Sequence, residues 1–109
     1  MTSSKYRAVW LFAMFDVPVD SSLARKQYAR FRAALLREGF MMLQFSVYAR
    51  YFSSEESASA YRRRLRESIP ARGQVRFLAV TDRQFGRMEV HYGKSIQAAE
   101  GRPAQMLLF

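Results

Sequence analysis

The side chain best placed for chemistry in this sequence is the carboxylate of Asp16. It follows an apolar segment, residues 8–15, and precedes Val17 and Pro18, so it stands where a buried strand ends and a loop begins. Strand ends commonly carry functional side chains on a rigid support. The alternative role is that of a strand-end cap or turn former. One carboxylate makes a poor Mg²⁺ site, but a two-fold dimer that brings two Asp16 side chains together would make a better one.

Basic side chains form the broadest chemical pattern. The chain of 109 residues has 18 Lys and Arg against 9 Asp and Glu, a formal charge of +9, and 15 of the 18 are arginine. Arginine presents a planar fork that can hold a phosphate with two hydrogen bonds. The excess charge therefore favours nucleic acid over a membrane surface as the partner. The alternative interpretation is that these residues form a solvated helix face with no binding role. The candidate nucleic-acid-binding residues are Arg25, Lys26, Arg30, Arg32, Arg37, Arg62, Arg63, Arg64 and Arg66.

Other site chemistries find little support. Cysteine is absent, which excludes disulfides, thiolate zinc sites and a cysteine nucleophile. His91 is the single histidine, and the five glycines are scattered, so no glycine-rich phosphate loop exists. No window approaches the roughly 20 apolar residues that a membrane-spanning helix needs, and we therefore expect no membrane partner and a cytoplasmic location.

The elements that must position these side chains follow from hydrophobic spacing. Residues 8–15 are apolar throughout and predict a central strand covered on both faces. A helix begins near residues 20–22 and ends at Gly39, and its apolar face is Ala24, Tyr28, Phe31 and Leu35. Residues 40–52 predict one long bent strand or two. A second helix runs from residue 55 to about 68, a strand covers residues 75–80, and a short one covers 88–92.

This order, βαββαβ plus a tail, predicts an α+β ferredoxin-like sandwich. Its antiparallel sheet carries two helices on one face, with the first and third strands in the middle. We expect one ferredoxin-like domain over residues 1–95 and a C-terminal strand or tail over 96–109. The tail ends in Gln105, Met106, Leu107, Leu108 and Phe109, which are too apolar to stay in water. We predict that these five residues bind a partner chain, the alternative being that they fold back on their own domain.

RNA-recognition modules share this element order and stack bases on exposed sheet aromatics. Their Lys/Arg-Gly-aromatic octapeptide is missing here, and residues 45–48 (Phe-Ser-Val-Tyr) do not reproduce it. An RNA-binding module is therefore the alternative interpretation.

Three segments together resemble the CRISPR-associated protein 2 family. Residues 14–18 (Met-Phe-Asp-Val-Pro) end the first strand, and residues 43–50 (Leu-Gln-Phe-Ser-Val-Tyr-Ala-Arg) follow the first helix. Residues 81–88 (Thr-Asp-Arg-Gln-Phe-Gly-Arg-Met) follow the second helix and are similar to members that accompany type II systems. Many members carry tyrosine where this chain has Phe15, and phenylalanine where it has Tyr48.

The resemblance implies a ferredoxin-like homodimer that bridges dimers of the CRISPR integrase subunit and binds duplex DNA during spacer acquisition. Some members are described as Mg²⁺-dependent endonucleases on RNA or double-stranded DNA. In them the strand-end aspartate of each protomer is catalytic and binds the metal, which here is Asp16. Two interpretations stay open, a metal-dependent phosphodiesterase and a DNA-binding scaffold without catalysis. A stand-alone, toxin-like ribonuclease of the same fold is a further alternative.

Overall fold

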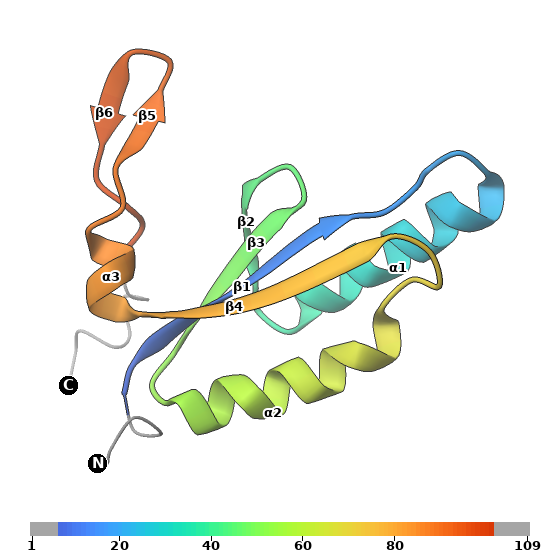
Figure 1. The fold of residues 1–109 in the computed structure, drawn as a ribbon, viewed down its shortest axis with the longest axis horizontal. Coiled ribbons are helices and arrows are strands. Elements are labelled where there is room, and N and C mark those ends of the chain that lie inside the picture. The colour runs from blue at the N-terminus through green and yellow to red at the C-terminus, as the bar shows by residue number, and fades with distance from the viewer. Residues whose placement is uncertain (1–6, 102–109) are drawn as a thin grey trace.

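The computed structural model describes residues 7–101, and the predicted α+β class is confirmed (Figure 1). The predicted partner segment Gln105–Phe109 lies outside the described residues. The elements in chain order are β1 (Val9–Asp16), α1 (Ser22–Arg37), β2 (Met41–Gln44), β3 (Val47–Phe52), α2 (Glu55–Leu65), the 3₁₀ turn η2 (Arg66–Ser68), β4 (Gln74–Thr81), α3 (Asp82–Gly86), β5 (Val90–Tyr92) and β6 (Ser95–Gln97).

The main sheet has four strands in the order β2-β3-β1-β4, all antiparallel. β1 and β4 therefore lie side by side, as the ferredoxin-like topology requires, and β1 occupies a central position. Val9, Trp10 and Leu11 are buried, which agrees with the prediction of a covered strand. Toward its C-terminal end β1 becomes less covered, because Phe12 and Met14 are only half-buried.

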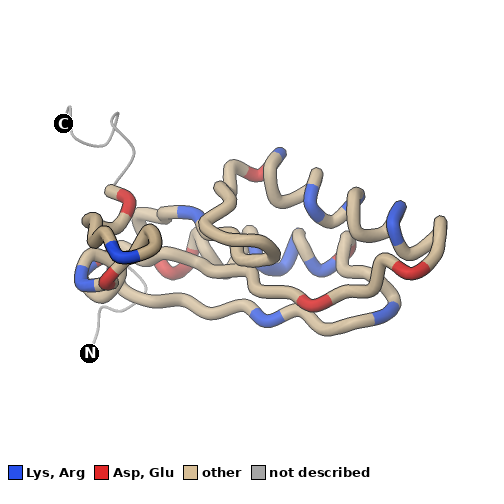
Figure 2. The backbone as a smooth tube through the Cα atoms, turned by 90° about the horizontal axis from the view of Figure 1, so that it is seen from above, with Lys and Arg blue, Asp and Glu red and all other residues tan. Residues whose placement is uncertain are grey.

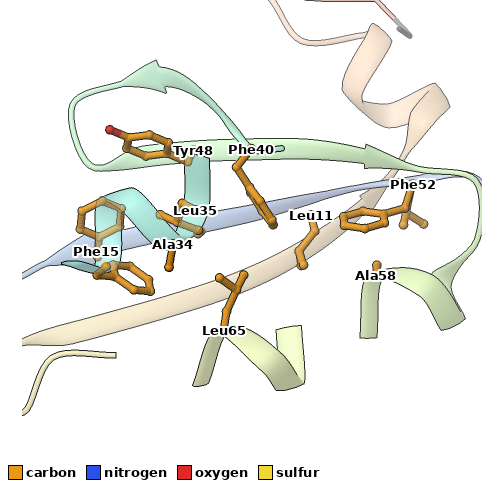
Figure 3. Close-up of a cluster of buried hydrophobic side chains, with 12 residues drawn as sticks. Leu11, Phe15, Ala34, Leu35, Phe40, Tyr48, Phe52, Ala58 and Leu65 are labelled. Atoms are coloured by element: carbon orange, nitrogen blue, oxygen red, sulfur yellow. The ribbon is translucent and has the colours of Figure 1, made fainter. Parts of the chain in front are cut away.

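The main core lies between one face of the sheet and the helices α1 and α2 (Figure 3). β1 contributes Leu11, Ala13 and Phe15 to this core, so every second residue of the strand points toward the helices. The residues that pack against them from the helices are Phe31, Ala34, Leu35, Ala58 and Leu65. The opposite face of the sheet carries no α1 or α2, as the view along the layers shows (Figure 2). We call this opposite face the open face.

Side chains at the helix ends stop and start the helices where the sequence predicts. Ser21 caps α1 by accepting a hydrogen bond from the Ala24 amide at 3.0 Å, and Ser54 caps α2 in the same way. Gly39 takes a φ of +87° just after α1, a conformation that favours glycine and lets the chain turn into β2.

The structure decides one open alternative and adds one element that the sequence analysis did not predict. Residues 40–52, predicted as one long bent strand or two, form two strands, and the turn between them is Phe45-Ser46, where Ser46 takes a φ of +62° although it is neither glycine nor asparagine. Residues 82–86 form the short helix α3, capped by Thr81 and Gln84 in a capping box. The last two strands pair with each other as a separate hairpin. β6 thus spans the position at residue 95 where the sequence analysis ended the domain.

α3 is anchored to one end of the open face through Trp10. Phe85 stacks on the Trp10 ring with centroids 3.9 Å apart, and the indole nitrogen donates a 2.8 Å hydrogen bond to Asp82. The end of the open face near the start of β1 is therefore covered, whereas the end near Asp16 is not.

Gly73 allows the chain that enters β4 to pass close to the end of β1. Its φ is +94°, and an added Cβ would lie 2.6 Å from the backbone oxygen of Asp16. We expect Gly73→Ala to lower the free energy of unfolding by about 1–3 kcal/mol, because both the backbone conformation and this contact become strained. Denaturation followed by circular dichroism measures the change.

Gly86→Ala is the matched control, since Gly86 has no positive φ and nothing lies within 4 Å of its added Cβ. Equal stability of the two variants would contradict this account of Gly73.

Candidate functional site

The carboxylate of Asp16 lies at the end of β1 on the open face. Phe15 points into the helix-side core, and because strand side chains alternate, Asp16 shares the other face with Phe12 and Met14. Its side chain is exposed, whereas Ala13 and Phe15 are buried. The predicted place of Asp16, at the end of a buried strand, is therefore confirmed, and its functional role stays a prediction.

Both flanks of this strand end are fixed by backbone contacts. On one side the register pairs Asp16 with Gln74 of β4. On the other side the Phe15 amide donates a 3.0 Å hydrogen bond to the Ser46 carbonyl, which places the β2–β3 turn beside Asp16. That turn carries Phe45, whose side chain is 88% exposed. Asp16 thus projects from a backbone that is held on one side by β4 and on the other by the β2–β3 turn.

Arg76 shares the open face with Asp16, and the sequence analysis did not select it. The register pairs Arg76 with Met14, one diagonal step from Asp16, and its Nε donates a 2.8 Å hydrogen bond to Gln74 Oε1. The signal was present in the alternation of β4, where Gln74, Arg76 and Leu78 interleave with the core residues Val75 and Phe77.

The described residues of one chain do not assemble a cluster of metal ligands. No group of three or more His, Asp or Glu side chains able to hold a metal ion occurs within residues 7–101. Asp16 can supply one carboxylate ligand, and Mg²⁺ in proteins commonly combines one or two carboxylates with waters and phosphate oxygens. Asp16 fits such an ion if a second copy of the chain brings a second carboxylate.

Most of the predicted basic residues lie on the other side of the sheet, on α1 and α2 (Figure 2). Three of them meet: Arg30 and Arg37 of α1 and Arg64 of α2 line one groove of about 440 Å³ between the helices. Glu38 and Glu67 lie in the same groove. The structure thus brings part of the predicted basic set together, but it separates this groove from Asp16 by the thickness of the sheet.

Several of these cations already have partners on the chain. Arg32 donates to the Tyr48 hydroxyl at 2.8 Å, Arg25 donates to the Val19 carbonyl, and Arg64 forms a 2.9 Å ion pair with Glu38. The hydrogen bond to Glu38 raises the pKa of the Arg64 guanidinium above its usual value, so this group stays charged. Arg30, Arg37 and Arg63 are exposed and remain candidates to contact a phosphate backbone.

A second basic group escaped the sequence analysis because its parts are far apart along the chain. Arg50 of β3 lies 4.4 Å from the centre of the Tyr61 ring of α2, and Arg64 lies 4.1 Å from the same ring. Hydrogen bonding to Arg50 is the main cause that lowers the pKa of the Tyr61 hydroxyl. The aromatic ring holds two guanidinium groups beside the groove, in cation–π contacts that helical spacing alone does not reveal.

Other features restrict the choice of function. His91 is exposed on β5 and pairs with Glu89, as expected for a surface histidine. Within residues 7–101, no helix is both long and apolar enough to cross a membrane.

Comparison with known proteins identifies a family. The profile described as CRISPR associated protein Cas2 matches residues 9–88. A protein of Parvibaculum lavamentivorans named CRISPR-associated endoribonuclease Cas2 is 50% identical over 93% of this chain and all of its own length. Proteins with the same name from Flavobacterium psychrophilum and Paracidovorax avenae are 39% and 40% identical, over 97% and 95% of this chain and 92% and 96% of their own lengths.

Asp16 is expected to be dispensable for folding, because no described residue gives its carboxylate a hydrogen bond or ion pair. We predict that Asp16→Asn changes the free energy of unfolding by no more than about 0.5 kcal/mol. Asp82→Ala is the contrasting variant, since it leaves the buried Trp10 indole without its acceptor and should lose about 1–3 kcal/mol. Chemical denaturation checks both values, and a large loss in Asp16→Asn would assign that residue a structural role.

Proposed function

The chain belongs to the CRISPR-associated Cas2 family, and from this premise we propose that it is a homodimeric adaptation subunit that binds duplex DNA and bridges the integrase. The observation that carries the proposal is that the arginine groove and the open face lie on opposite sides of the sheet. Arginines of two helices converge on one groove, and the sheet face that helices leave uncovered is free to meet a second copy.

The open face supports the proposed dimer. Near Asp16 it combines half-buried Phe12, Met14 and Val47 with Leu78, which is 50% exposed. Packing this face against the same face of a second copy would remove apolar surface from water on both chains. Such a two-fold arrangement uses the same patch twice, as most homodimers do. The basic helices of both copies would then lie on the outside of the dimer, available to DNA.

The basic helices support duplex binding through the sugar-phosphate backbone. Arginine contacts with phosphates release condensed counterions, so affinity falls steeply with salt and depends little on sequence. The net charge of +9 is consistent with binding through phosphate contacts of this kind. Arginines on the outer surface of these helices would contact the DNA backbone and would not contact base edges. Binding would therefore depend little on the DNA sequence.

The test is the salt dependence of duplex binding, measured by fluorescence anisotropy on DNA of unrelated sequences. We expect similar affinities for all sequences and a steep fall with salt. Arg30→Glu combined with Arg37→Glu should weaken binding at least about tenfold and flatten the salt slope, because both exposed cations line the groove.

Arg83→Glu combined with Arg87→Glu is the matched control, since these two exposed arginines belong to α3 and the residue that ends it. Equal losses from the two pairs would mean that net charge alone binds DNA. A flat salt slope in the wild type would overturn backbone binding.

A metal-dependent endonuclease is the second candidate function. It is supported by the names of the relatives, endoribonuclease, and by the exposed carboxylate of Asp16 at a strand end. In this proposal the Asp16 carboxylates of two copies would hold Mg²⁺, which supplies Lewis-acid activation of a phosphodiester. The chain's own part is to present each carboxylate from a backbone fixed by Gly73, Ser46 and Gln74.

We predict that Asp16→Asn abolishes Mg²⁺-dependent cleavage of RNA or duplex DNA and leaves duplex binding almost intact, because it removes a metal ligand but no phosphate contact. Gel electrophoresis of labelled substrates, with and without Mg²⁺, measures cleavage. Asp20→Asn is the matched control, an exposed carboxylate that pairs with Arg72 on the neighbouring loop. Cleavage by Asp16→Asn at the wild-type rate would assign the activity to another group or to a contaminant.

We also propose that the C-terminal residues Gln105–Phe109 contact a partner chain. Their apolar composition supports this role.

A further inference from the structure

The open face carries two charged strand residues of opposite sign. Strand alternation places Asp16 of β1 and Arg76 of β4 on this face, and the other strand residues there, such as Phe12, Met14 and Leu78, are uncharged. Both charged side chains are exposed. A lone acid and a lone base on an otherwise apolar surface are costly to bury unless each finds a partner.

The two groups do not pair with each other within one chain. Arg76 is bonded through Nε to Gln74, which is the register partner of Asp16, and residues 7–101 contain no ion pair between Asp16 and Arg76. Gln74 therefore holds the guanidinium along β4, beside the carboxylate but not on it. Both charges stay available to a molecule that covers the face.

A second copy of the chain is the molecule that these charges fit. In a two-fold interface, if residue i contacts residue j of the partner, residue j contacts residue i of the partner. One acid and one base on a self-associating face therefore give two ion pairs at once. Without a counter-charge, two Asp16 carboxylates close together across the axis would repel each other.

We propose that Arg76 is the counter-charge of Asp16 across the dimer interface, so that each Arg76 pairs with the Asp16 of the other copy. The inference rests on the proposed function, because it requires the open face to be the dimer interface. It restricts that interface to arrangements in which the Asp16 end of β1 in one copy lies over Arg76 of β4 in the other.

Other ionisable groups near this face come from the hairpin and the residues after it. Glu89, His91 and Glu100 line a cavity of about 370 Å³ together with Phe12 and Val47. Glu89 is paired with His91, which leaves Glu100 as the acid to compare with Asp16. Glu100→Arg therefore makes the same change of charge near the same face and serves as the matched control.

The test is a charge exchange read out as dimer affinity by sedimentation velocity on the full chain. Asp16→Arg and Arg76→Asp should each weaken the dimer at least about tenfold, because each places like charges opposite one another. The double variant Asp16→Arg/Arg76→Asp should return the affinity to within about threefold of the wild type, since the pairs are restored with their signs exchanged. Circular dichroism confirms that each variant is folded.

The outcomes separate this inference from the proposed dimer. Leu78→Glu places a charge on the apolar part of the face, so a wild-type monomer, or a Leu78→Glu dimer as stable as wild type, would overturn the open-face dimer and the inference with it. If Leu78→Glu dissociates the dimer but the charge exchange fails to restore it, the inference alone is wrong. Rescue of Glu100→Arg by Arg76→Asp would assign Arg76 to Glu100 and would equally overturn it.

Discussion

The burial of one face of β1 beneath two helices is the constraint on which the rest of the structure depends. Leu11, Ala13 and Phe15 pack into the helix-side core, and the side-chain period of a strand is two. Asp16 must therefore face the opposite side, together with Phe12 and Met14. A shift of one residue in register would place the carboxylate in the core and expose the aromatic ring of Phe15. The same packing that stabilises the fold thus fixes where the acid can act.

This constraint puts the two groups of candidate site residues on opposite sides of the sheet. The groove between α1 and α2 collects Arg30, Arg37 and Arg64, whereas the open face presents Asp16 and Arg76. Because the sheet lies between them, a single chain cannot hold a duplex on its helix arginines and present the same phosphates to Asp16. In the proposed dimer the helix arginines would lie on the outside and the Asp16 carboxylates between the two copies, so the separation would persist. The proposed scaffold role needs only the outer side, and cleavage would need the inner one.

The longer helices and strands were predictable because the spacing of their apolar residues along the sequence shows which face is buried. The apolar run of β1 and the spacing of Phe31 and Leu35 in α1 required no knowledge of the partner segments. The turn at Phe45-Ser46 contains no glycine or asparagine, the residues that usually mark such a turn in a sequence. Its positive φ falls on Ser46 instead. The helix α3 was also missed, because it has only five residues. Its position depends on the stacking of Phe85 on Trp10, which lies 75 residues away along the chain.

Composition and hydrophobic spacing were enough to predict the element order, the α+β class, the basic character of the two helices and the place of Asp16 at the end of a buried strand. Which charged side chains become neighbours depends on the folded chain. The arrangement of α1 and α2 placed Arg37 and Arg64 in one groove and paired Glu38 with Arg64, although these residues are too far apart in the sequence for helical spacing to bring them together. The antiparallel register of β1 and β4 placed Arg76 beside Asp16. The physical reason is that local propensity and hydrophobic period act over a few residues, whereas these neighbours are set by contacts between distant segments that form only when the core closes.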